Sequence, residues 1–161
     1  MPANKKPRKK YRPSPLIGNV MEFVKDSVTP VAAYNGHYVT KWGLLLHSAL
    51  TDLAEGVGTI ESLSTIIASH YVCAALVQRL KLGVEHAPVL KTSADALKAV
   101  TSRYKGVDYH TATPEEMDAI NALGELHDAF MAMVTVGEIG KAHSIAVNLL
   151  RIRTRLKEPL L

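Results

Sequence analysis

The histidines are the residues of this 161-residue chain best suited to chemistry near neutral pH. An imidazole can serve there as an acid, a base or a metal ligand. There are seven: His37, His47, His70, His86, His110, His127 and His143. A helical metal site needs a second ligand three or four residues away, and the sequence contains neither a Glu-x-x-His nor a His-x-x-x-His pair. The spacing therefore predicts no metal site.

His127 is followed directly by Asp128, a carboxylate that could orient the imidazole ring. The apolar periodicity places His70, His127 and His143 on inward helix faces, and each is expected to be a core histidine bonded to a neighbouring helix. An enzyme that uses His127 and Asp128 is the alternative. No nucleophile, metal site or cofactor loop accompanies the pair, so we predict no catalytic residue, no cofactor and no enzymatic activity.

Other reactive groups have an ordinary structural interpretation. Cys73 is the only cysteine and lies in an apolar stretch, which is typical of a buried and inert thiol. The 56–58 Gly-Val-Gly segment lacks the lysine and the strand of a phosphate-binding loop. The joints near glycines 56 and 83 connect helices too long for a helix-turn-helix motif, and their faces lack Arg, Asn and Gln.

A cationic arm opens the chain. Residues 5–12 hold six of the 19 basic side chains. The rest of the chain therefore has 13 basic and 15 acidic side chains. The candidate nucleic-acid-binding residues are Lys5, Lys6, Arg8, Lys9, Lys10, Tyr11 and Arg12. The cations suit phosphates, and Tyr11 suits stacking on a base or sugar. An acidic protein face, a solubilising tail and a nuclear localisation signal remain open alternatives.

A second basic patch ends the last predicted helix and consists of Arg151, Arg153, Arg155 and Lys157. Arg151 and Arg155 share one helical face, and the other two share another. Positive charge here also complements the helix dipole, which is a sufficient structural explanation. Between the two clusters, residues 13–150 carry nine basic and 14 acidic side chains. The charge of the chain is therefore polarised.

Periodicity and capping signals predict an all-α fold. Residues 1–13 form a flexible, disordered basic arm, and residues 14–161 form one domain. The predicted helices span about 16–27, 38–55, 60–82, 85–105, 114–134 and 136–157. The first is short and the other five are long, and their short connections favour an antiparallel bundle. Thr59 is a predicted N-cap, and capping boxes begin at Thr113 and Thr135.

The inward faces follow from three- and four-residue steps. The helix over 38–55 should bury Trp42, Leu45, Leu46, Ala49, Leu50 and Leu53. The last helix should bury Ile139, His143, Ala146, Leu149 and Leu150. Gly18, Asn19 and Glu22 interrupt the apolar stretch after the arm, so it does not form a signal peptide. No run approaches the roughly 18 apolar residues of a membrane span, and a soluble protein is expected.

The chain resembles a group of small uncharacterised helical proteins that phages, prophages and mobile elements of proteobacteria encode. The likeness rests on the basic arm with its Lys-Lys-Tyr-Arg-Pro at 9–13, on the following helical body and on Glu-Leu-His-Asp at 125–128. It implies a setting, the bacterial host cytoplasm, and no particular mechanism. A nuclear localisation signal has no use in that setting.

These observations predict a non-enzymatic accessory or regulatory protein of a phage or mobile element. Its bundle surface would dock on a host or phage protein, and its arm would contact nucleic acid. The alternative is a protein-binding inhibitor or adaptor, directed at a host transcription or defence protein, that does not bind nucleic acid. The identity of the partner, the choice between DNA and RNA, and the oligomeric state stay open.

Overall fold

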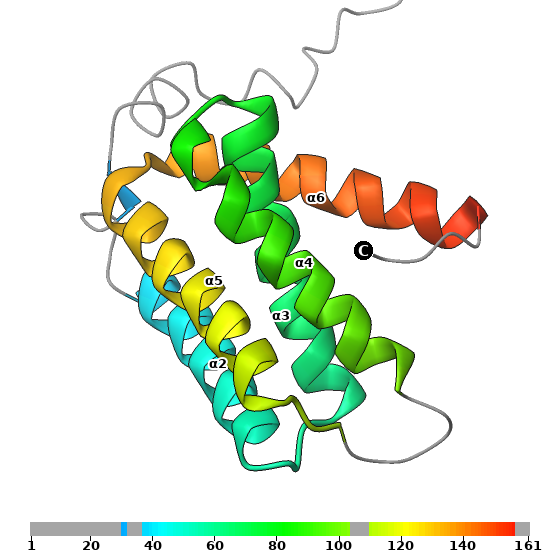
Figure 1. Cartoon of the computed structure of the whole chain (residues 1–161). Coiled ribbons are helices and arrows are strands. Elements are labelled where there is room, and N and C mark those ends of the chain that lie inside the picture. Colours follow the sequence, from blue (N-terminus) through cyan, green and yellow to red (C-terminus); the bar gives the residue numbers. More distant parts are fainter. Residues whose placement is uncertain (1–29, 32–36, 104–109, 157–161) are drawn as a thin grey trace, which may run out of the picture.

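The computed structural model describes residues 30–31, 37–103 and 110–156, and this part of the chain is mostly helical (Figure 1). Its five α-helices are α2 (His37–Ala54), α3 (Ile60–Ala74), α4 (Ala87–Ser102), α5 (Pro114–Met133) and α6 (Val136–Leu156). A π-helical turn, η3 (Ala75–Arg79), continues α3, and a 3-10 turn, η4 (Val84–His86), precedes α4. The all-α prediction is confirmed. The predicted arm and the helix over 16–27 lie outside the described residues.

The predicted caps explain why three of these helices start where they do. Thr59 accepts the amide of Ser62 at 3.3 Å at the start of α3. At α5, Glu116 N donates to Thr113 Oγ1 at 3.3 Å, while the Glu116 carboxylate accepts the Thr113 amide at 2.8 Å. Thr135 and Glu138 form the same pair of hydrogen bonds at the start of α6, so both predicted capping boxes are present. Each satisfies amides that the first helical turn leaves without a partner.

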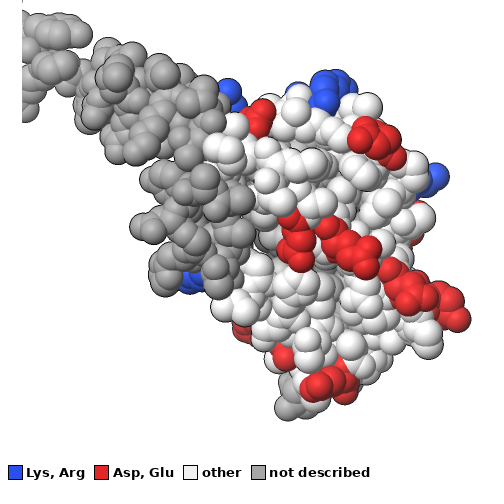
Figure 2. Space-filling model, turned by 90° about the vertical axis from the view of Figure 1, so that its left-hand side faces the viewer, with Lys and Arg blue, Asp and Glu red and all other residues white. Residues whose placement is uncertain are grey.

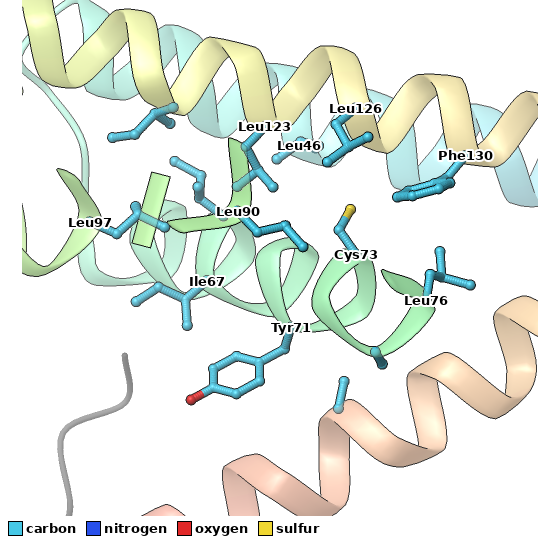
Figure 3. Packing of buried hydrophobic residues seen from close by; sticks show 14 of the residues in the cluster. Leu46, Ile67, Tyr71, Cys73, Leu76, Leu90, Leu97, Leu123, Leu126 and Phe130 are labelled. Carbon is cyan, nitrogen blue, oxygen red and sulfur yellow. The ribbon is translucent and has the colours of Figure 1, made fainter. Parts of the chain in front are cut away.

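The central helix is α3, which contacts α2, α4, α5 and α6. The core contains fully buried side chains from several of these helices, including Leu46, Ile66, Leu97 and Leu123. Figure 3 shows the labelled side chains of α5 above α3, with Tyr71 on the opposite side of α3. A helix with neighbours around most of its circumference must be apolar on most faces, which fits the sequence of α3.

The joint between α3 and α4 differs from the prediction. One helix was expected over 60–82, but the α-helical bonding ends at Ala74, and Leu80 N donates to Ala75 O at 3.0 Å. This is the wider π-helical spacing, in which one extra residue is accommodated. Lys81 and Gly83 then take positive φ values of 60° and 61° and reverse the chain. Regular α4 consequently starts at Ala87 rather than at about residue 85.

Two backbone contacts join segments that are distant in sequence. Val31 N donates to Val134 O at 2.8 Å, and His110 N donates to Gly58 O at 2.7 Å. The first hydrogen bond joins Val31 to the corner between α5 and α6. The second ties the turn before α3 to the segment before α5.

Two inward-face predictions are wrong. Leu45 has 47% of its surface exposed, and His143 is also exposed. On α2 the buried arc passes through Leu46, Ala49 and Leu53, and Leu45 lies about 40° beyond Ala49, just outside this arc. On α6 the closely packed residues are the small side chains Ala142 and Ala146, so His143 is likewise displaced from the contact. Apolar periodicity locates a face only to within about one residue.

Within the described residues, the continuous helix Ile60–Arg79 has the length and composition of a membrane span. Its most apolar window is 61% buried inside the fold. Burial of this kind is also found in the central helix of a packed core, so this apolar window has a structural explanation.

Candidate functional site

The cationic end of α6 is the predicted binding patch that the structure describes best. Arg151 and Arg155 are exposed, and Ile152 between them has 53% of its surface exposed. In Figure 1 this end of α6 extends past the other helices. The two arginines are four residues apart and therefore project from one face, separated by about one helical turn. Lys157 lies outside the described residues, as does the whole arm.

Arg153 has a different environment from its two neighbours. Its guanidinium lies over the ring of Tyr71, 5.7 Å from the ring centroid, and the side chain is half-buried. A guanidinium over an aromatic face is held by the ring quadrupole, and the contact joins α6 to α3. Arg153 therefore contributes to the fold, and Arg151 and Arg155 are the exposed cations among the described residues of the patch.

Charge is separated between the last two helices. α5 carries Glu115, Glu116, Asp118, Glu125 and Asp128 and contains no Lys or Arg. α6 has one acidic residue, Glu138, in its first turn, and its later charged residues are all basic. Figure 2 views the side of the molecule where α2 and α5 lie in Figure 1, and it shows acidic side chains in a band across that face. A polyanion would be repelled by α5 and attracted by the end of α6.

Asp128 joins two histidines from two helices. His47 on α2 donates from Nε2 to Asp128 Oδ2 at 2.8 Å, and His127 Nδ1 lies 3.4 Å from Asp128 Oδ1. His127 is 4% exposed, whereas His47 and Asp128 are about half exposed. Burial lowers the pKa of His127, although the adjacent carboxylate opposes this effect. Burial in the folded chain therefore favours the neutral form of the His127 imidazole.

Of the two histidines His70 and His127, both predicted to bond to a neighbouring helix, only His70 does so in the described part of the chain. His70 Nε2 contacts the Leu90 carbonyl at 3.0 Å and so connects α3 to α4. Burial lowers the pKa of His70 as well. For His127, burial was predicted correctly, but its hydrogen-bond contact is with its own neighbour, Asp128.

Cys73 is buried, as predicted. Its exposed fraction is 0%, and burial raises the pKa of the thiol to about 12. The nucleophilic thiolate is therefore scarce at neutral pH. In the described part of the chain, no group of three His, Cys, Asp or Glu side chains is arranged to hold a metal ion.

Two polar pairs were not anticipated from the sequence. The His47–Asp128 pair spans 81 residues. The other is the forked contact of Arg103 with Glu116, in which Arg103 Nη1 donates to Oε1 at 2.6 Å and Nη2 contacts Oε2. Local spacing along the chain does not reveal such pairs, because contacts between distant helices depend on how those helices dock.

No protein-family model matches the chain, and comparisons with curated proteins and with solved structures give no match either.

Proposed function

We propose that this chain is a non-enzymatic accessory protein that binds nucleic acid through two cationic segments: the arm over residues 5–12 and the end of α6. The charge separation between α5 and α6 carries the proposal. Arg151 and Arg155 stand exposed on one face of a helix that projects from the fold. Such a surface meets phosphates without desolvating any buried group.

The same proposal gives the helices a role as a platform. They would form an antiparallel bundle, and its acidic side would face a protein rather than nucleic acid, because the acidic side chains of α5 repel phosphates. On the resemblance described above, we propose that the protein acts in a bacterial cytoplasm, where it would assist a phage or mobile element. Docking on a host or phage protein would supply the specificity that a charged arm lacks.

The test is nucleic-acid binding by the full chain as a function of salt concentration. If the arm contacts about four to six phosphates, log K should fall against log[salt] with a slope of about −3 to −5. Replacing Lys5, Lys6, Lys9 and Lys10 together with Ala should flatten the slope and weaken all sequences alike. The reason is that phosphate contacts carry no base information.

A second variant tests the end of α6. The double change Arg151→Gln and Arg155→Gln should make the slope shallower by about one to two, since each phosphate contact contributes about 0.9. Arg153 is left in place because it packs on Tyr71. The matched control is Lys91→Gln with Lys98→Gln, which removes the same charge from exposed positions of α4. The control should leave the slope unchanged if the patch, and not net charge, is responsible.

The protein-binding inhibitor makes the opposite prediction. The isolated chain would show no measurable nucleic-acid binding, and a complex with one host protein would survive nuclease treatment. That pair of results would replace the nucleic-acid proposal.

A further inference from the structure

A cavity of about 230 Å³ lies among α3, α5 and α6, with Trp42 of α2 and Val31 at its edge. Its walls are mostly apolar and include Val72, Met131 and Ile139. An apolar cavity of about 150 Å³ is sufficient to bind benzene. By that comparison, this one has space for a molecule of about nine or ten non-hydrogen atoms.

Two deeply buried polar side chains also line this cavity. Ser69 of α3 is 5% exposed and His127 of α5 is 4% exposed. Among the described residues, neither the Ser69 hydroxyl nor Nε2 of His127 has a hydrogen-bond partner. The Ser69 hydroxyl and His127 Nε2 are not among the fully buried polar atoms of the described residues that lack a hydrogen bond. A buried polar group without a partner costs free energy, and a ligand that supplies the partner recovers it.

The charges around the cavity restrict what can enter. Among the described residues, no Lys, Arg, Asp or Glu lines it. The Asp128 carboxylate can only accept, so Nδ1 of His127 facing it carries the proton and Nε2 is left as an acceptor. A carboxylate or an ammonium group would enter without a counter-charge, which is costly. An uncharged ligand with a hydroxyl group does not have this cost.

We propose that this cavity binds an uncharged, largely apolar small molecule that carries one hydroxyl group. The apolar body lies against Trp42, Met131 and Ile139, and the hydroxyl group can donate to His127 Nε2 and accept from Ser69. His143, whose ring meets the Trp42 ring edge-on at a centroid distance of 5.7 Å, stands exposed at the rim. This inference does not depend on the nucleic-acid proposal, because no residue of the cationic patch lines the cavity.

Trp42 provides a direct readout, since it is the only tryptophan in the chain. The probe is para-propylphenol, and propylbenzene is its match without the hydroxyl group. Titration of the full chain should change Trp42 emission saturably with the phenol. Calorimetry should give an affinity at least about fivefold higher than that for propylbenzene, the ratio expected of one hydrogen bond.

Gly140 allows the cavity to be blocked without disturbing the core. It lines the cavity, and a Cβ placed on it would meet no heavy atom within 4 Å. Gly140→Leu should lower the affinity for para-propylphenol at least about tenfold by occupying the space. Gly43→Leu is the matched control: its Cβ also meets nothing within 4 Å, and Gly43 does not line the cavity. This control should bind normally.

Ser69→Ala separates polar recognition from simple apolar filling. It should reduce the preference for the phenol over propylbenzene while leaving propylbenzene binding unchanged. If the wild-type chain binds neither probe, or if Gly140→Leu binds as the wild type does, the proposal is wrong.

The rival occupant is a segment of the chain itself: residues 16–27, predicted to be an amphipathic helix, precede the lining residue Val31 in the sequence. A variant with Ser at the four predicted apolar positions distinguishes the two occupants. These positions are Ile17, Val20, Met21 and Val24. If the variant gains probe binding that the wild type lacks, the cavity holds this segment and the small-molecule proposal is overturned. Equal binding by both chains supports the proposal.

Discussion

Glu116 shows how much one side chain does at the start of α5. Its carboxylate accepts the Thr113 amide within the capping box and also pairs with Arg103, which follows α4. The hydrogen bonds from Arg103 are the main reason that the pKa of Glu116 lies below its usual value. Arg103 also donates to the Thr111 carbonyl at 3.1 Å. A local cap and a tertiary contact therefore share one carboxylate.

Two of the buried histidines, His70 and His127, predict how the free energy of unfolding depends on pH. Burial lowers the pKa of His70 and of His127 from the ordinary value of 6.5. Below pH 6.5 the unfolded chain takes up protons that the folded chain refuses. The free energy of unfolding should therefore be highest above about pH 7, fall as the pH drops, and level off once the folded pKa values are passed.

Chemical denaturation at several values between about pH 7.5 and pH 5 measures the slope of the free energy of unfolding against pH. His70→Leu and His127→Leu should each make it shallower, whatever they do to stability at neutral pH. His143→Leu is the comparison at an exposed histidine position. A wild-type slope of zero over this range would contradict burial of the two neutral rings.

At the scale of single helices, the capping boxes should determine how firmly α5 and α6 begin. Thr113→Ala removes the acceptor of the Glu116 amide and should cost about 1 kcal/mol, as should Thr135→Ala at α6. Adding Glu116→Ala to Thr113→Ala should cost less than the sum of the single changes, because both groups serve one box. Denaturant unfolding of the four chains measures this; strict additivity would show that the two groups act independently.

Replacing glycine by alanine should change stability in opposite directions at Gly140 and at Gly83. Gly140→Ala should stabilise the protein by about 0.5–1 kcal/mol, because it lies within α6 and its added Cβ meets open space. Gly83→Ala should destabilise it by more than about 1 kcal/mol. At Gly83, φ is +61° and the new Cβ would lie 3.0 Å from the Phe130 ring. Thermal unfolding distinguishes the two; a stabilised Gly83→Ala would contradict the described turn.

For the whole molecule, the arrangement of charge matters more than the total of +4. Basic residues cluster at residues 5–12 of the sequence and at the end of α6, whereas α5 carries only acidic charges. Such a molecule should be oriented by a polyanion rather than merely attracted to it.

The fold should not depend on the arm. A chain that begins at Ser14 should keep its helical circular dichroism and its melting temperature to within about two degrees. Capping and burial signals start there, and exposed tails contribute little to stability. Its nucleic-acid affinity should nevertheless drop. A large loss of melting temperature would show that the arm packs on the helices.

Local chemistry is what the sequence alone determined about this protein. The caps at Thr59, Thr113 and Thr135 and the start of α2 within one residue of prediction depend on neighbours a few positions away. Burial of Cys73 and His127 was predicted for the same reason: an apolar periodic face must be covered somewhere. The cationic patch, too, is a property of adjacent residues.

Only the tertiary structure decided which helix covers each face. The His47–Asp128 pair, the Arg103–Glu116 pair and the cavity around Ser69 each need two or more helices at one distance and rotation. That geometry is set by packing between side chains far apart in sequence, and a rotation of one residue moves a side chain by 100°. His143, predicted inside and found at the cavity rim, differs by one such step.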